Sequence, residues 1–243
     1  MNYDFFAEYY DELMSDVDYA ARARYIDSII KERKPDAHLL VDLACGTGSM
    51  TVEFAALGYD VIGTDQSENM LSKAREKSDD SILYLCQSMQ ELDMYGTIDA
   101  FVCTFDSLNH IEDRAQLVLA LSRVSLFLEP DGVFVFDMNT LYKHRTILAD
   151  NVFVYETEDV FCVWQNEYTE RGKVEIALDF FERQPDGSYI RECENFCEKA
   201  YSLEATEQIL KEAGLKILAM YDDMTRNYPR SESERIVFVV GKR

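Results

Sequence analysis

A glycine-rich turn between an apolar run and a helical pattern is the segment of this sequence best suited to bind a ligand. The run 38–44 is typical of a buried strand, and the turn after it contains Gly46 and Gly48. Because glycine has no Cβ, a ligand can approach such a turn closely, and the next helix N-terminus offers unpaired N–H groups to an anion. Asp65 ends the following apolar run, where its carboxylate can accept both hydroxyls of a ribose. The pattern predicts a site for an adenosine-containing ligand.

Two residues distinguish the candidate cofactors. The dinucleotide fingerprint G-x-G-x-x-G requires a third glycine, but Thr51 stands at that position. Asp42, which precedes Gly46, would repel a pyrophosphate and would attract the ammonium and sulfonium groups of S-adenosylmethionine. The charge pattern therefore favours S-adenosylmethionine over NAD. Asp42 acting only as a helix cap, and the glycines acting only as turn residues, are the alternatives.

Two segments resemble the cofactor motifs of class I S-adenosylmethionine-dependent methyltransferases. Residues 41–48 (VDLACGTG) are similar to the first motif of that family, and residues 63–71 (GTDQSENML) are similar to its acidic-loop motif. The resemblance implies that Asp65 holds the ribose and that Gln66 and Met70 flank the adenine.

A third contact segment of the family is matched at residues 87–89. Ser88 stands where the family usually has an acidic residue, so backbone contacts at Met89 are expected to replace that side chain. By this resemblance the cofactor-binding residues are Tyr10, Tyr19, Asp42, Ala44, Gly46, Gly48, Asp65, Gln66, Met70, Ser88, Met89 and Phe105.

The start of the chain is similar to a group of uncharacterised bacterial methyltransferases. Residues 6–14 (FAEYYDELM) carry this likeness, and those proteins also have an insertion after the fifth strand. In such relatives the N-terminal helices fold over the cofactor. The likeness implies that Tyr10 and Tyr19 close the pocket.

The acceptor residues are expected after the fourth strand. Residues 103–110 (CTFDSLNH) resemble the corresponding segment of small-molecule N-methyltransferases, including those that act on amino sugars. His110 is the candidate general base, since an imidazole can take a proton near neutral pH, and Asp106 could orient the acceptor or attract a cationic one. Asp137 and Asn139 end the fifth strand at the same edge of the sheet. For all four, an ordinary polar or capping role is the alternative.

The apolar periodicity that positions these residues predicts an α/β fold. It is Rossmann-like and doubly wound, with a mostly parallel sheet, helices on both faces and an antiparallel β insertion after the fifth strand. The five leading strands are expected at 38–44, 59–64, 82–86, 98–103 and 133–137, and the last two at 215–221 and 235–240. Residues 129–132 (EPDG) are expected to form a turn that closes the preceding helix.

Three parts of the chain are predicted. Residues 1–37 are helical and form a cap over the cofactor, while 38–150 and 201–243 form the methyltransferase core. Residues 151–200 hold four strand-like runs without an intervening helix, so they should form an antiparallel meander that acts as an acceptor lid. Its many aromatic side chains could pack on the main domain, stack on a substrate or form a dimer contact.

Composition restricts the partners. The 243 residues include 24 Lys and Arg against 46 Asp and Glu, a net charge of −22 that disfavours nucleic acid because phosphate contacts need basic side chains. A small-molecule acceptor fits this charge, and a homodimer is an open alternative. The six cysteines are scattered and suit reduced thiols in the cytoplasm, and neither a metal site, a signal peptide nor a membrane span is predicted.

The sequence thus favours a methyltransferase that acts on a small molecule, with nitrogen preferred over oxygen. Methylation of a protein or tRNA is a second interpretation. A cofactor-binding scaffold without turnover is a third, and a dehydrogenase is the last.

Overall fold

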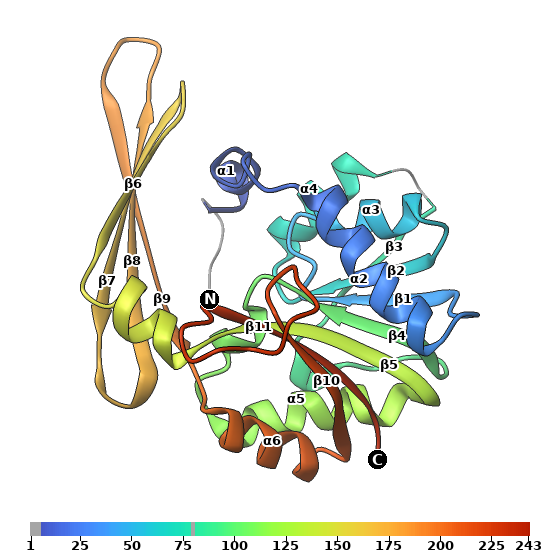
Figure 1. Cartoon of the computed structure of the whole chain (residues 1–243). Coiled ribbons are helices and arrows are strands. Elements are labelled where there is room, and N and C mark those ends of the chain that lie inside the picture. The colour runs from blue at the N-terminus through green and yellow to red at the C-terminus, as the bar shows by residue number, and fades with distance from the viewer. Residues whose placement is uncertain (1–5, 79–80) are drawn as a thin grey trace.

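The fold is built on a seven-stranded sheet, and this computed structural model describes residues 6–78 and 81–243. The strand order is β10-β11-β5-β4-β1-β2-β3, and neighbours are parallel except that β11 runs antiparallel to β5 and β10 (Figure 1). The strands are β1 (Leu39–Leu43), β2 (Asp60–Asp65), β3 (Leu83–Cys86), β4 (Ile98–Cys103), β5 (Leu128–Asn139), β10 (Leu215–Asp222) and β11 (Arg235–Lys242).

Helices cover both faces of this sheet because its central strands are apolar on both sides. In β4, Ala100 and Val102 pack with α2 and α3, whereas Phe101 and Cys103 pack with α5 and α6. The helices are α1 (Phe6–Leu13), α2 (Tyr19–Arg33), α3 (Ser49–Ala56), α4 (Glu68–Lys77), α5 (Arg114–Phe127) and α6 (Leu203–Glu212). The short helices are η1 (Met89–Glu91), η2 (Ser107–His110), η3 (Lys143–Leu148) and η4 (Glu170–Gly172).

A second, four-stranded antiparallel sheet is inserted after β5. Its order is β6 (Val152–Glu156), β7 (Val160–Tyr168), β8 (Lys173–Arg183) and β9 (Tyr189–Lys199). One face of this sheet is buried against Tyr9 and Leu13 of α1 and Leu148 of η3. Figure 1 shows the inserted sheet to one side of the main sheet, with α1 between them. The insertion thereby adds a wall beside the carboxyl ends of the parallel strands.

The predicted fold class and the insertion are confirmed, but the turn at residues 129–132 is wrong. That segment lies inside β5, where Leu128 pairs with Ile98 and Val133 already pairs with Ala100. The extra residues form a bulge in the strand. Burial of Leu128 against the sheet explains why the strand begins there and not at Val133.

The structure also bears on the predicted absence of a membrane span and on the predicted N-terminal cap. In the part of the chain that the structure describes, no helix is both long and apolar enough to span a membrane. Residues 1–5 of the predicted cap lie outside the described residues.

Candidate active site

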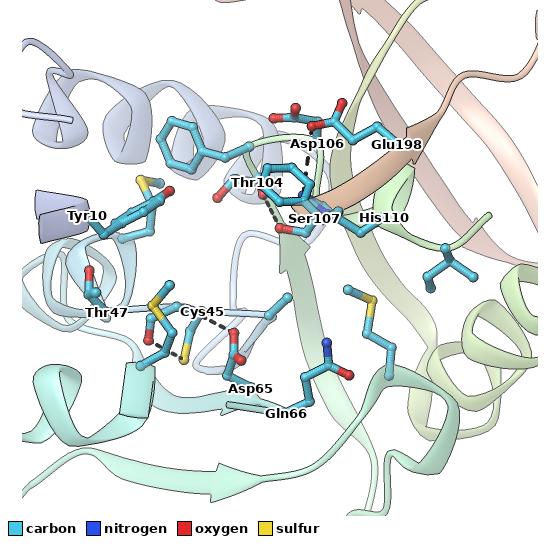
Figure 2. A pocket seen from close by; sticks show the side chains of 18 of the residues that line it. Tyr10, Cys45, Thr47, Asp65, Gln66, Thr104, Asp106, Ser107, His110 and Glu198 are labelled. Atoms are coloured by element: carbon cyan, nitrogen blue, oxygen red, sulfur yellow. Dashed lines mark hydrogen bonds and ion pairs between the residues drawn. The ribbon is translucent and has the colours of Figure 1, made fainter. Parts of the chain in front are cut away.

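A cavity of about 700 Å³ opens where β1, β2 and β4 end, and it extends to the inserted sheet (Figure 2). Gly48, Ser88, Asp137 and Asn139 are the predicted site residues that do not line it. The predicted residues that do are Tyr10, Tyr19, Asp42, Ala44, Gly46, Asp65, Gln66, Met70, Met89, Phe105, Asp106 and His110.

Asp65 holds the glycine turn against the next loop. Its Oδ2 accepts a hydrogen bond from the backbone N–H of Gly46 at 2.9 Å, and its Oδ1 accepts one from Ser67 at 2.8 Å. Burial raises the pKa of Asp65, and these backbone donors oppose that effect. Each carboxylate oxygen has two acceptor positions, so both can still accept a hydroxyl from a ligand.

The two glycines of the turn have different tasks. A Cβ on Gly46 would meet no atom within 4 Å, and this residue lines the cavity, so the space beside its backbone is open to a ligand. Gly48 has a φ of +77°, and a Cβ there would lie 2.8 Å from Cβ of Ala74 and 2.9 Å from the hydroxyl of Tyr84. Gly48 therefore permits close packing behind the turn.

Asp42 lies at the end of β1, almost fully buried. Its Oδ2 accepts a hydrogen bond from Oγ1 of Thr51 at 2.6 Å. Burial raises the pKa of Asp42 to about 7, although the Thr51 bond opposes this shift. Thr51 stands where a dinucleotide-binding turn has its third glycine. It is thus the hydrogen-bond partner of Asp42, the carboxylate that favours S-adenosylmethionine over NAD.

A pH dependence follows for the affinity of S-adenosylmethionine. Asp42 is neutral below its pKa of about 7 and charged above it, so attraction to a cationic ligand weakens as the pH falls. We expect the Kd to rise by up to about tenfold per pH unit between pH 7 and 5.5, where the ligand ammonium stays protonated. Calorimetric titrations across this range measure it.

Two variants serve as controls for that prediction. Asp42→Asn should bind more weakly and lose the pH dependence. Thr51→Val removes the hydrogen bond that lowers the pKa of Asp42. In this variant the change of Kd with pH should therefore occur at higher pH. If the Kd of Asp42→Asn still rises as the pH falls, Asp42 is not the group that causes the pH dependence.

The first two helices close one side of the cavity. Tyr10 of α1 and Tyr19 of α2 line it, and the Tyr19 ring meets Phe105 edge-on at 5.5 Å. The Tyr19 hydroxyl is buried without a hydrogen-bond partner among the described residues, and burial raises the pKa of Tyr19 to about 12. An orphaned donor in the wall of a cavity fits a ligand acceptor group.

Asp11, which the sequence analysis missed, fastens α1 to the glycine turn. Its Oδ1 accepts a hydrogen bond from Oγ1 of Thr47 at 2.7 Å, and its Oδ2 pairs with Nζ of Lys77 at 2.6 Å. A second ion pair joins Glu8 to Lys73 of α4 at 2.7 Å. These contacts hold α1 over the cavity.

The backbone after β4 is held in an uncommon conformation. Phe105 and Asp106 have φ of 56° and 54°, in the left-handed region that non-glycine residues rarely adopt. Both of their N–H groups donate to the carboxylate of Asp137, at 3.0 and 2.7 Å. The strained pair is thus fixed by a buried side chain, as is common at functional sites.

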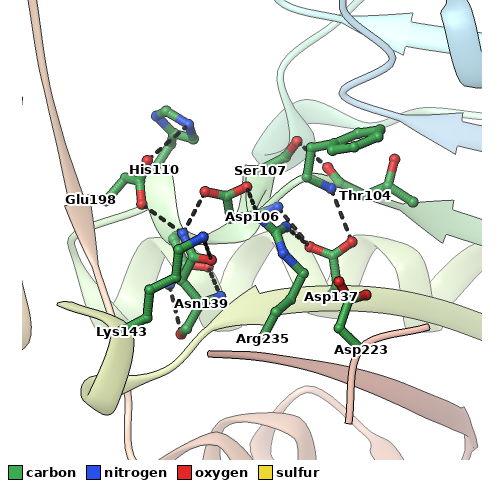
Figure 3. Close-up of polar contacts among 12 residues, drawn as sticks. Thr104, Asp106, Ser107, His110, Asp137, Asn139, Lys143, Glu198, Asp223 and Arg235 are labelled. Atoms are coloured by element: carbon green, nitrogen blue, oxygen red, sulfur yellow. Dashed lines mark hydrogen bonds and ion pairs between the residues drawn. The ribbon is translucent and has the colours of Figure 1, made fainter. Parts of the chain in front are cut away.

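Asp106 is an ionised group with partners on both oxygens (Figure 3). Arg235 donates to its Oδ1 at 2.9 Å, and Asn139 donates to its Oδ2 at 2.5 Å. Burial alone would raise the pKa of Asp106, but the positive charges of Arg235 and Lys143 outweigh it and hold that pKa below its usual range. Asp106 therefore supplies a fixed negative charge and does not accept a proton near neutral pH.

His110 meets residues of the inserted sheet in the cavity. Its ring centroid is 5.2 Å from that of Phe196, and its Nε2 lies 4.0 Å from Oε1 of Glu198. Tyr155 and Trp164 of the same sheet also line the cavity, with ring centroids 6.2 Å apart. Part of the insertion's aromatic set thus faces the ligand space.

The sequence analysis missed Glu198, Arg235 and Lys143. Each lies far along the chain from the motif segments, and no local pattern marks it. Among the described residues, no group of three or more His, Cys, Asp or Glu side chains could hold a metal ion.

Comparisons with known proteins agree with this geometry. A family model described as a methyltransferase domain matches residues 40–132. Over the whole length of both chains, the sequence is 33% identical to a protein of Geobacillus sp. (strain WCH70) that bears the name methyltransferase. The dTDP-3-amino-3,4,6-trideoxy-alpha-D-glucopyranose N,N-dimethyltransferase of Streptomyces venezuelae is 34% identical over 118 residues, 49% of each chain.

A solved structure resembles the whole chain. The crystal structure of a S-adenosylmethionine-dependent methyltransferase from Clostridium acetobutylicum ATCC 824 has a TM-score of 0.87 and 32% identity. The match covers 99% of this chain and 98% of that one, so the inserted sheet is part of the likeness. From the glycine turn, the acidic strand end and these full-length relatives, the chain belongs to the S-adenosylmethionine-dependent methyltransferases.

Proposed function

We propose that this methyltransferase acts on a small-molecule amine. The observation that carries the proposal is that one cavity joins the cofactor residues to an acceptor side built by His110, Glu198 and aromatic residues of the insertion. Helices α1 and α2 would serve as the cap over the cofactor, and residues 151–200 as the acceptor lid.

The residues around the glycine turn fit S-adenosylmethionine. When bound, it supplies a methyl group on a positively charged sulfur. Asp65 would accept the ribose hydroxyls, Gln66, Met70 and Met89 would surround the adenine, and the backbone of Ala44 and Gly46 would face the amino-acid part. Asp42 would attract the positive charges, and the unpartnered Tyr19 hydroxyl would donate to the carboxylate.

The acceptor side favours nitrogen over oxygen. Methyl transfer is a displacement that needs alignment, and a neutral amine already has the electron pair that attacks. A hydroxyl must first lose a proton to a base, and Asp106 is a poor acceptor for it because Arg235 and Lys143 hold the pKa of Asp106 below its usual range. Several acidic residues line the cavity, which disfavours an acceptor that carries phosphate near the methyl group.

The Streptomyces venezuelae relative supports this choice. Its name describes dimethylation of an amino-sugar nitrogen, but the match spans about half of each chain. The likeness therefore supports nitrogen as the acceptor atom and leaves the acceptor itself to experiment.

The test is a transfer assay with S-adenosylmethionine labelled in its methyl group. The wild-type protein is offered separate panels of amines, alcohols, bulk tRNA and a basic protein, and the labelled product is identified by mass. We expect label on amine nitrogen, with loss of at least about 100-fold in rate in His110→Gln. Label found only on tRNA, protein or alcohols would show that amines are not the acceptors. Binding of S-adenosylmethionine without transfer in any panel would favour a cofactor-binding scaffold.

A further inference from the structure

Glu198 is a buried carboxylate that the inserted sheet places against the main domain. Only 3% of the residue is exposed, and it lies on β9. Its Oε2 accepts a hydrogen bond from Nδ2 of Asn139 at 3.1 Å. Its Oε1 faces His110 and its Oε2 faces His144, so one carboxylate lies between two imidazoles (Figure 3 shows the His110 side).

The hydrogen bonding of His144 shows where its proton lies. The ring is fully buried, and its Nδ1 is 2.8 Å from the carbonyl oxygen of Gly172. A carbonyl oxygen only accepts, so Nδ1 carries the hydrogen. Nε2 then lies 3.5 Å from Oε2 of Glu198, and in a neutral ring its lone pair would face a carboxylate oxygen. The repulsion between that lone pair and the carboxylate favours a positive charge beside Glu198.

The surrounding ion pairs leave this region short of positive charge. Arg235 pairs with Asp106 and Asp137, and Arg22 pairs with Asp223 at 2.9 Å. Lys143 donates to Oδ1 of Asn139 at 3.0 Å. The network holds four carboxylates and three fixed cations, namely Asp106, Asp137, Glu198 and Asp223 with Arg22, Lys143 and Arg235. A buried network of this kind favours an additional cation.

The spacing between Glu198 and His110 suits an ammonium group. Oε1 and Nε2 are 4.0 Å apart, and a nitrogen placed about 2.9 Å from each can donate a hydrogen bond to both. The aromatic ring of Phe196 packs beside His110 and limits its movement. The pair therefore forms a two-point receptor for a protonated amine on the acceptor side.

We propose that Glu198 is the positioning residue of a His110–Glu198–His144 unit that takes up the acceptor as its ammonium form and removes a proton from it. This inference rests on the proposed function and names the charge state of its substrate. An N–H bond of the ammonium breaks, an Nε2–H bond of His110 forms, and the electron pair stays on the amine nitrogen. Glu198 stabilises the resulting imidazolium. The free electron pair then bonds to the methyl carbon as the carbon–sulfur bond breaks onto sulfur, and His110, which is 27% exposed, returns the proton to solvent.

The test uses nuclear magnetic resonance of the ring nitrogens of the three histidines, followed against pH. His38 is exposed and serves as the internal reference. The charged groups around the unit include Asp65 and Asp106, whose charges act on His110, and Glu112 and Asp113, which line the same cavity. Lys143 donates to Asn139, the hydrogen-bond partner of Glu198. Glu198→Gln keeps an acceptor for Asn139 and removes the charge. The matched control is Glu175→Gln, an exposed carboxylate on the same sheet that pairs with Lys173.

We expect the titration midpoint of His110 to fall by about one pH unit in Glu198→Gln, with His38 unchanged and with no shift in Glu175→Gln. An unchanged midpoint in Glu198→Gln, or an equal shift in Glu175→Gln, overturns the proposal. These spectra need no turnover. Methyl transfer to amines together with an unchanged titration midpoint of His110 in Glu198→Gln would therefore refute this inference and leave the proposed function standing.

A second measurement on the wild-type protein covers the case in which Glu198→Gln does not fold. Ethylammonium chloride is titrated into the complex with S-adenosylhomocysteine, and ethanol is the uncharged comparison. Ethylammonium should shift the ring-nitrogen signals of His110 and leave those of His38 in place, and ethanol should shift neither. Equal responses to the two additives overturn the proposal.

Discussion

Replacing Asp65 by alanine is expected to lower the affinity for S-adenosylmethionine and S-adenosylhomocysteine by at least about 100-fold. The change removes two proposed hydrogen bonds from ribose hydroxyls to a carboxylate, and bonds of this kind are worth about 1.5–3 kcal/mol each. It also releases the N–H groups of Gly46 and Ser67, which hold the turn in place. Since about 1.4 kcal/mol corresponds to a factor of ten, the loss should be clear in a calorimetric titration.

Asp60→Ala is the matched control because Asp60 is an exposed carboxylate at the start of the same strand. Its affinity should stay within about twofold of wild type. Circular dichroism confirms that both variants are folded. Unchanged binding in Asp65→Ala would show that this carboxylate does not hold the ribose.

Replacing Arg235 by methionine is expected to lower the free energy of unfolding by about 3–5 kcal/mol. Arg235 donates to both Asp106 and Asp137, whose side chains are 16% and 2% exposed, so its loss removes the hydrogen-bonded cation of both carboxylates. Arg22, at 3.8 Å from Asp137, remains as a more distant partner. Asp137 in turn holds the strained backbone at Phe105 and Asp106. Urea unfolding followed by circular dichroism measures the change.

Arg230→Met is the control for that substitution. Arg230 pairs with Asp222 but is 78% exposed, so its loss should change stability by about 1 kcal/mol or less. Adding Asp106→Asn to Arg235→Met removes one uncompensated charge and should recover part of the stability. Equal effects of Arg235→Met and Arg230→Met would show that the buried network does not stabilise the fold.

The core of the fold could be predicted because its signals are local. Apolar runs such as 98–103 are buried on both faces, and the turn glycines and Ser67, whose side chain caps α4, mark the helix boundaries. The antiparallel sheet could also be predicted from a local signal, because helical spacing changes to consecutive strand-like runs at 151–200. The bulge in β5 could not be read locally, because residues 129–132 are typical of a turn and only pairing across β4 extends the strand.

The cofactor side of the site was more predictable than the acceptor side. Asp42 and Asp65 end consecutive strands, so the topology brings them to one edge. The sequence motif does not distinguish the roles of its two glycines, but the structure does. Gly46 lines the cavity, whereas Gly48 packs against Ala74. Glu198 and Arg235 come from late strands, and their positions depend on long-range packing that no spacing in the sequence reveals.

The most direct test of the whole account is a calorimetric titration of the wild-type protein with S-adenosylmethionine, S-adenosylhomocysteine and NAD. We expect one molecule of either adenosyl ligand to bind per chain with a Kd in the micromolar range, about −8 kcal/mol, and NAD not to bind. Tight binding of NAD by the folded protein, with no binding of either adenosyl ligand, would contradict the assignment of the cavity.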